Sequence, residues 1–183
     1  MNSNDINPGR RALLGSMLSL AAGGGVAAAA PSLQDHGTAP EFDGIEQWLN
    51  SPPLTLSALR GKVVLVDFWT YSCINCLRTL PHVNRWAETY KAQGLVVVGV
   101  HTPEYAFERS TGNVQTAMRR FGVQHPVAQD NRYATWKAYG NQYWPAIYLV
   151  DARGQIRFKH FGEGRYQETE AAIQALLAAA AAR

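Results

Sequence analysis

Val63-Val64-Leu65-Val66-Asp67-Phe68-Trp69-Thr70-Tyr71-Ser72-Cys73-Ile74-Asn75-Cys76 carries the strongest structural signal in the chain. Residues 63–69 form an almost continuous apolar run rich in β-branched valine. Such a run predicts a strand that is buried on both faces of a sheet. From Cys76 onward, apolar residues recur at helical spacing. The stretch therefore predicts a buried strand, a short loop and a helix, with two cysteines at the junction of the loop and the helix.

The two cysteines point to redox chemistry. Cys73 and Cys76 are the only cysteines among the 183 residues, and a disulfide across so short a loop would add little stability. A thiol at a helix start lies near free N–H groups and the positive end of the helix dipole, which favour the thiolate. Cys73 is therefore the predicted nucleophile, and Cys76, one turn inward, is the predicted resolving thiol. A C-x-x-C pair beside a strand-helix-strand pattern is typical of a thiol redox site.

Composition and spacing exclude two other classes of protein. A structural zinc site needs four ligands, but the five histidines show no H-x3–5-H spacing that would complete one. We therefore expect no metal and no cofactor. The net charge is only +3 and the basic residues are scattered, which argues against a nucleic-acid partner. We expect a monomer.

The rest of the chain alternates between helical and strand patterns, which indicates an α/β domain. Strand-helix-strand units imply a parallel sheet with right-handed crossovers. The turn at residues 151–154 adds an antiparallel hairpin at the sheet edge. After the first strand, the predicted elements are a helix over 76–94, a strand over 95–101, a helix over 113–122, a short strand over 126–128, a helical turn over 134–139, strands over 146–150 and 155–161, and a helix over 166–182.

The N-terminus has the pattern of an export signal. Arg10 and Arg11 precede an uncharged, Ala/Gly-rich run over residues 12–30 that offers A-x-A cleavage sites. The paired arginines favour a twin-arginine signal; a Sec leader and an uncleaved membrane anchor are the alternatives. All three place the domain outside the cytoplasmic membrane of a bacterium, in the periplasm or anchored at its surface. The predicted organisation is a signal peptide over 1–30, a flexible entry segment over 31–44 and a folded domain over 45–183.

Several motifs resemble those of known families. Val66-Asp67-Phe68-Trp69, the C-x-x-C pair and Pro81 match thioredoxin in type and spacing. Residues 59–64 and 101–104 resemble the TlpA/redoxin branch. Residues 68–76, 101–108 and 143–146 are most similar to the thioredoxin-like domain of DipZ-type proteins. The resemblance covers about residues 40–180 and implies a thioredoxin fold: a central mixed sheet flanked by helices, with a redoxin-type N-terminal extension.

The resemblance implies a catalytic role for Asp67. A lone carboxylate within an apolar strand is costly to bury, and burial raises its pKa. A base of raised pKa is able to pass protons in both directions near neutral pH. By analogy with thioredoxin, Asp67 is expected to relay a proton to and from Cys76. The alternative is a structural aspartate that pairs with Lys62 or with water.

The resemblance also implies a substrate-binding surface. Pro145 matches the cis-proline of the thioredoxin fold, which leaves nearby backbone free to pair with a substrate; a trans proline that opens an edge strand is the alternative. Trp144 is expected to face the thiols and to influence the choice of partner, and Trp69 is expected to cover the site. The alternative for both tryptophans is a purely structural role in the core.

Together these features predict an exported thiol–disulfide oxidoreductase that reduces disulfides of periplasmic proteins. DipZ proteins carry a membrane electron-transfer domain that is not found in this sequence, so we expect a separate membrane electron donor of the CcdA/DsbD type. No histidine lies between the cysteines, as it does in strongly oxidising relatives, which favours the reducing direction.

Two alternative functions stay open at this point. The first is a thiol peroxidase, because Thr70-x-x-Cys73 resembles part of the peroxiredoxin motif. That motif, however, requires proline where Val66 stands. The second is a copper or haem carrier that would use the thiols with a histidine such as His101. Copper carriers of this fold usually space their cysteines by three residues rather than two.

Overall fold

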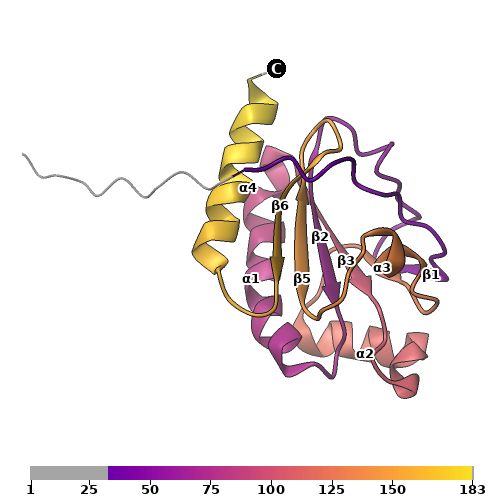
Figure 1. The fold of residues 1–183 in the computed structure, drawn as a ribbon. Coiled ribbons are helices and arrows are strands. Elements are labelled where there is room, and N and C mark those ends of the chain that lie inside the picture. Colours follow the sequence, from indigo (N-terminus) through magenta and orange to yellow (C-terminus); the bar gives the residue numbers. More distant parts are fainter. Residues whose placement is uncertain (1–32, 183) are drawn as a thin grey trace, which may run out of the picture.

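The computed structural model describes residues 33–182, so the predicted signal peptide lies outside the described residues. Helices and strands alternate along the chain as shown in Figure 1. The strands are β1 Gln47–Leu49, β2 Val63–Trp69, β3 Leu95–His101, β4 Val127–Gln129, β5 Ala146–Val150 and β6 Ile156–Phe161. The helices are α1 Ile74–Tyr90, α2 Thr111–Phe121, α3 Ala134–Ala138 and α4 Tyr166–Ala181, with short 3-10 turns η1 Lys91–Gln93 and η2 Ala106–Arg109.

The six strands form one mixed sheet in the order β1-β4-β3-β2-β5-β6. β2, β3 and β4 run parallel, and β5 and β6 add the expected antiparallel hairpin beside β2. The predicted thioredoxin fold with a mixed sheet is therefore confirmed. The sequence patterns did not indicate β1, which has three residues and pairs antiparallel with β4.

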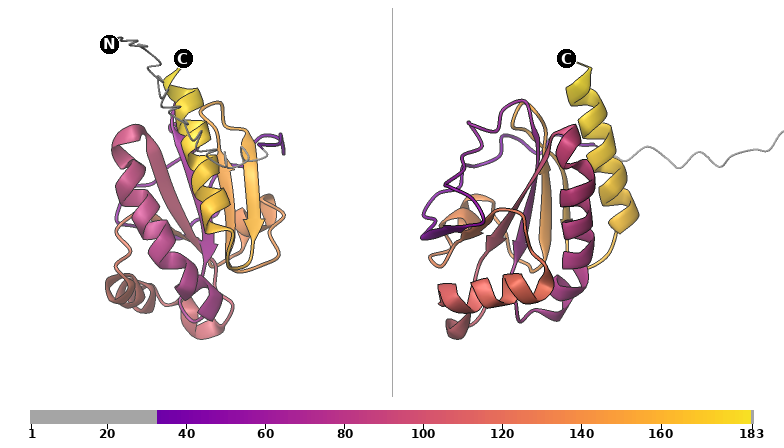
Figure 2. Two further views of the ribbon diagram at one scale, coloured as in Figure 1. Left: turned by 90° about the vertical axis from the view of Figure 1, so that its left-hand side faces the viewer. Right: turned by 180° about the vertical axis from the view of Figure 1, so that it is seen from behind.

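Helices cover one face of the sheet, and irregular chain covers most of the other. Figure 2 shows α1 and α4 side by side on one face, while α3 and the segment before β2 lie on the opposite face. Strand β2 supplies both cores because its residues alternate between the faces. Val63 and Leu65 pack with α1 and α4, whereas Val64, Val66 and Phe68 pack in the opposite core. Every residue of β2 is buried, as the continuous apolar run predicted.

The described part of the entry segment lies along the hairpin of β5 and β6. Within residues 33–44, Thr38 forms a β-bridge with Gln155, and the N–H of Ile156 donates to the carbonyl of Gly37 at 2.9 Å. Ala39 is buried in the core on that face. The backbone of this segment thus pairs with the outer edge of the hairpin, which satisfies N–H and C=O groups that would otherwise be open; its flexibility stays a prediction.

Helix α1 begins two residues earlier than predicted, because Cys73 is its N-cap residue and not part of the loop alone. No helix within residues 33–182 has the length and apolar character required to cross a membrane.

Candidate active site

The two thiols lie where β2 ends and α1 begins, at the lower end of the sheet in Figure 1. Cys73 caps α1 with extended backbone angles (φ −74°, ψ 115°) and is partly exposed, whereas Cys76 is buried. Both are free thiols. The partly exposed Cys73 at the helix start is thus more accessible to a substrate than Cys76, which is buried in the first turn.

The surroundings of the two thiols shift their pKa values in opposite directions. A hydrogen bond from the side chain of Cys76 lowers the pKa of Cys73 to about 6, with the backbone N–H groups of Cys76 and Asn75 acting in the same direction. Partial burial and the nearby charge of Glu104 oppose this shift. The pKa of Cys76 is raised, mainly by burial and then by its bond to Cys73. At neutral pH the pair therefore holds one thiolate, on Cys73, and one proton, on Cys76.

Asp67 lies in the centre of β2, opposite Gly99 on β3 and Ile147 on β5. Its side chain is almost fully buried, and burial raises its pKa to about 7. Its Oδ1 atom has no hydrogen-bond partner within residues 33–182, and the ion pairs of this region do not include one with Lys62. Its charge reaches the thiol of Cys76, whose pKa it helps to raise. Within residues 33–182, Asp67 thus has no ion pair with Lys62, and burial holds its pKa near neutrality.

Trp144 and Pro145 directly precede β5. The Trp144–Pro145 peptide bond is cis, and the carbonyl of Pro145 accepts a hydrogen bond from the N–H of Gly162 at 2.8 Å. The half-buried indole of Trp144 packs against the same apolar cluster as Cys73 and Cys76. Its Nε1 donates to the carbonyl of Thr102 at 3.0 Å, which fixes the ring at the edge of the site. The structure thus places this predicted residue against the cluster that contains Cys76.

Trp69 does not lie over the site. Its side chain is fully buried, in the cluster that contains Cys76 and Leu80, and it meets the ring of His101 edge-on at 5.3 Å. A substrate on the surface is unable to touch it. The interpretation of Trp69 as a cover over the thiols is therefore corrected: as the last residue of β2 it points to the helical face, where α1 and α2 enclose it.

His101 and the other possible metal ligands do not gather at the site. His101 is fully buried, and burial lowers its pKa to about 4, so it is neutral at physiological pH. Its ring stacks on Tyr71 at 5.6 Å. Within the described part of the chain, no three His, Cys, Asp or Glu side chains come close enough to hold a metal ion.

Glu108 is a site residue that the sequence reasoning missed. It lies in η2, is fully buried, and accepts hydrogen bonds from Ser72, the residue before Cys73. Burial raises its pKa, but bonds from Ser72, Thr70 and nearby backbone outweigh this and leave the pKa lowered. In the sequence it is one of two glutamates in the motif of residues 101–108. No local pattern distinguishes it from Glu104, which is exposed.

A strand–loop–helix junction with a C-x-x-C pair, a buried aspartate and a cis-proline on a mixed sheet defines a protein of the thioredoxin fold. Within that fold the chain belongs to the Redoxin family, whose pattern matches residues 34–177. The predicted membership of the TlpA/redoxin branch is thereby confirmed.

Individual relatives agree with this assignment. The chain is 55% identical over 151 residues to protein DipZ of Mycobacterium tuberculosis, which covers 81% of this chain but 22% of DipZ; the chain thus spans about a fifth of that relative's length. It is 33% identical over 125 residues to the thiol-disulfide oxidoreductase YkuV of Bacillus subtilis, covering 68% of this chain and 82% of YkuV. A solved thioredoxin-like protein in the oxidized form is similar with a TM-score of 0.72 at 30% identity, covering 78% of this chain and 96% of that one.

Proposed function

We propose that this chain is a thiol–disulfide oxidoreductase in which Cys73 is the nucleophile, Cys76 the resolving thiol and Asp67 the proton acceptor. The observation that carries the proposal is the division of the thiol pair: an accessible Cys73 with its pKa lowered to about 6 and a buried Cys76 with its pKa raised. A thiolate is the attacking species in disulfide exchange, and a second thiol must stay protonated until its own step.

The reaction proceeds in two exchanges. The Cys73 thiolate attacks a substrate disulfide, a mixed disulfide forms, and one substrate sulfur leaves as a thiolate. Cys76 then gives its proton to Asp67 and attacks the sulfur of Cys73, which releases the second substrate thiolate. The substrate gains two electrons and becomes a dithiol, while Cys73 and Cys76 become a disulfide. An electron donor must reduce that disulfide again, and we propose a membrane protein of the CcdA/DsbD type.

Apolar surface around the thiols supports a protein as substrate. Within the described residues, the exposed large apolar side chains all lie on segments that flank the site, and exposed apolar groups that gather in this way mark interaction surfaces. Two pairs of rings stand close together: Tyr105 with Phe107 at 5.6 Å, and Tyr143 with Phe161 at 5.7 Å. The full set is Ile74, Tyr105, Phe107, Tyr143 and Phe161. We therefore propose disulfides of partly unfolded or flexible protein segments as the substrates.

The proposed place of action is the bacterial periplasm or the outer surface of the cytoplasmic membrane. This rests on the twin arginines and the uncharged run over residues 12–30. Replacing Arg10 and Arg11 by lysines in the producing cell, followed by fractionation, tests the export route. Retention in the cytoplasm supports a twin-arginine signal, and unchanged export supports a Sec leader.

The reducing direction is tested by the reduction potential of the Cys73–Cys76 pair, measured by equilibration with glutathione or dithiothreitol buffers. A value near that of thioredoxin, about −270 mV, supports a reductase. A value near −120 mV, as in strong oxidants of this fold, would make the protein a disulfide donor instead.

The structure offers no support for the thiol peroxidase alternative. The Thr70 hydroxyl, which that alternative would use, is buried and lies 3.4 Å from Nε2 of His101.

A further inference from the structure

We propose that Glu108 is a positioning residue for the nucleophile: its buried carboxylate holds the loop that carries Cys73 against the loop that follows β3. This inference rests on the proposed function of Cys73. Glu108 touches neither thiol nor substrate in this assignment, and it acts through the residues that it binds.

The carboxylate of Glu108 receives hydrogen bonds from two separate segments. Its Oε1 accepts from the hydroxyl of Ser72 at 2.5 Å and from the N–H of Ser72 at 3.3 Å. Its Oε2 accepts from the N–H groups of Glu104 at 2.6 Å and Tyr105 at 2.8 Å. One side chain thereby ties together two loops that lie more than 30 residues apart in the sequence.

A buried carboxylate that accepts this many hydrogen bonds is held firmly in position. An isolated carboxylate would be very costly to bury, and charge-assisted hydrogen bonds offset that cost. The lowered pKa of Glu108, in which the bonds outweigh the effect of burial, agrees with an ionised carboxylate at neutral pH. If the carboxylate were removed, the N–H groups of Ser72, Glu104 and Tyr105 would lose their acceptor.

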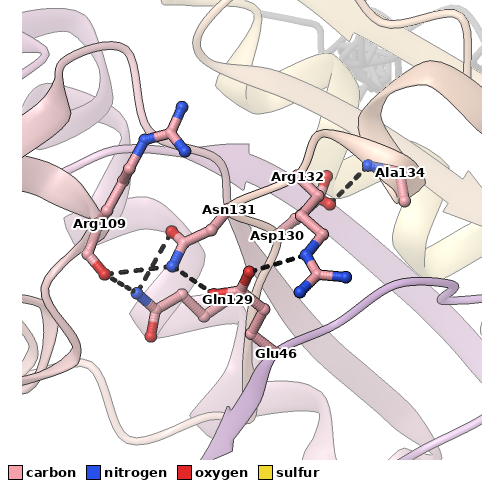
Figure 3. A network of polar contacts seen from close by, with 7 residues as sticks. All are labelled: Glu46, Arg109, Gln129, Asp130, Asn131, Arg132 and Ala134. Atoms are coloured by element: carbon pink, nitrogen blue, oxygen red, sulfur yellow. Dashed lines mark hydrogen bonds and ion pairs between the residues drawn. The ribbon is translucent and has the colours of Figure 1, made fainter.

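The backbone that carries Glu108 is itself fixed from the other side. Figure 3 shows that the carbonyl of the next residue, Arg109, accepts hydrogen bonds from Nε2 of Gln129 and Nδ2 of Asn131. The distances are 2.6 and 3.1 Å. Asn131 also donates to Glu46 beside β1 at 2.8 Å. Glu108 is thus held between the end of β4 and the loop of the nucleophile, so its carboxylate has little freedom to follow a displaced loop.

The position of Ser72 matters because Cys73 follows it directly. The thiolate of Cys73 depends on hydrogen bonds from the thiol of Cys76 and the N–H groups of Cys76 and Asn75, and such bonds weaken steeply with distance and angle. The loop from Thr70 to Ser72 is short, and the hydroxyl of Tyr71 forms a further tie by donating to the carbonyl of Phe107 at 3.0 Å. Both ties lead to the loop that carries Glu108.

The two ways in which Glu108 could act predict opposite shifts in the pKa of Cys73 when its carboxylate is removed. If Glu108 acted on Cys73 mainly by its charge, its removal would favour the thiolate and lower the pKa of Cys73. If it acts by position, its removal weakens the hydrogen bonds to the thiolate and the pKa rises. The charge that acts on Cys73 in this structure is that of Glu104, so we expect the second outcome.

The test is the pH profile of alkylation of Cys73 by iodoacetamide in the reduced full-length chain. We expect Glu108→Gln to shift the midpoint upward and to slow alkylation at pH 7 by about three- to tenfold, as the thiolate fraction falls. Ser72→Ala, which removes the hydroxyl alone, should give a smaller shift in the same direction. Ser72→Thr, which keeps the hydroxyl, should restore the wild-type profile.

Glu41→Gln is a matched control. The carboxylate of Glu41 also ties two segments together, through the N–H groups of Leu56 at 2.6 Å and Ser57 at 2.8 Å, but these precede β2 at the end opposite the thiols. We expect it to reduce the free energy of unfolding while the alkylation profile stays unchanged.

An unchanged or downward-shifted midpoint in folded Glu108→Gln protein would overturn the proposal. If Glu108→Gln does not fold, the alkylation profiles of Ser72→Ala and Ser72→Thr provide the test. Equal profiles in these two variants would overturn the proposed role of Glu108. Alkylation reports on Cys73 without any disulfide substrate. A wild-type chain that shows the thiolate but reduces no protein disulfide would therefore contradict the proposed function and not the role of Glu108.

Discussion

The thiol of Cys76 lies within electrostatic reach of the buried carboxylate of Asp67. Burial is the main cause of the raised pKa of Cys76, and the bond to Cys73 and the charge of Asp67 add to it. Burial likewise raises the pKa of Asp67 to about 7. A carboxylate whose pKa lies near neutrality thus acts electrostatically on the thiol that, in the proposed mechanism, must lose its proton in the second exchange.

Replacing Asp67 by Asn should slow the release of substrate from the mixed disulfide. The amide is unable to accept the proton of Cys76, so the second exchange becomes limiting while the first attack by Cys73 is unaffected. Rapid-quench measurement between pH 6 and pH 9 should show the mixed disulfide accumulating in the variant. Equal rates of resolution in the two proteins across this range would remove Asp67 from the mechanism.

The same residue should make stability depend on pH. The folded pKa of about 7 lies above the ordinary aspartate value of 3.8, so the folded state binds the proton more tightly than the unfolded state does. Its contribution to stability is fully present below about pH 4 and is lost as the pH rises through about 7. We expect Asp67→Asn to raise the free energy of unfolding at pH 8 by about 2–4 kcal/mol. Urea denaturation of the reduced proteins at pH 5 and pH 8 measures this, and an equal difference at both pH values would contradict it.

Replacing Cys76 by Ser should trap the substrate. Cys73 keeps its place at the start of α1 and still attacks, but no resolving thiol follows, so a mixed disulfide with the substrate accumulates. Cys73→Ser is the control and should form no adduct. Non-reducing gels and mass spectrometry detect the product. A Cys76→Ser protein that turns over protein disulfides at the wild-type rate would exclude the two-thiol mechanism.

Much of the site could be predicted from local sequence. The apolar run of β2 identifies Asp67 as buried, because a charged residue within a continuous strand has no exposed face to occupy. The spacing of Cys73 and Cys76 and the start of the helix determine which thiol is accessible. Pro145 was recognised by its resemblance to the cis-proline of the fold, since a single proline does not reveal its isomer.

The rest depended on contacts between distant segments. The roles of Trp69 and Trp144 differ because one points to the helical face of the sheet and the other lies at its end, which composition does not reveal. Glu108 is recognised by its bond to Ser72, 36 residues away. The entry segment has the prolines and glycines of a loop, yet it pairs at the edge of the sheet with Gln155. Edge pairing of this kind requires only backbone groups and leaves little trace in the sequence.

The aromatic pair beside the site should determine how well protein substrates bind. Tyr105 and Phe107 are both more than half exposed, and their rings are nearly parallel. Replacing both by Ser should raise KM for a protein that carries an accessible disulfide by about three- to tenfold, since each ring buries apolar area against a partner. The rate with a small disulfide such as oxidised glutathione is the control and should not change. An equal loss of activity with the protein disulfide and with oxidised glutathione would show that the substitutions impair the thiols rather than substrate binding.

Gly99 allows the packing behind the thiols, and adding one methyl group there should disturb it. A Cβ atom at Gly99 would lie 2.9 Å from Nε1 of Trp69 and 3.1 Å from Cε1 of His125. Both rings are buried, so we expect Gly99→Ala to lower the free energy of unfolding by about 1–3 kcal/mol. Gly112→Ala is the matched control: in α2 its Cβ would make only an ordinary contact, and alanine favours a helix by up to about 1 kcal/mol. Urea denaturation should therefore move the two variants in opposite directions, and a Gly99→Ala protein as stable as the wild type would contradict close packing around Trp69.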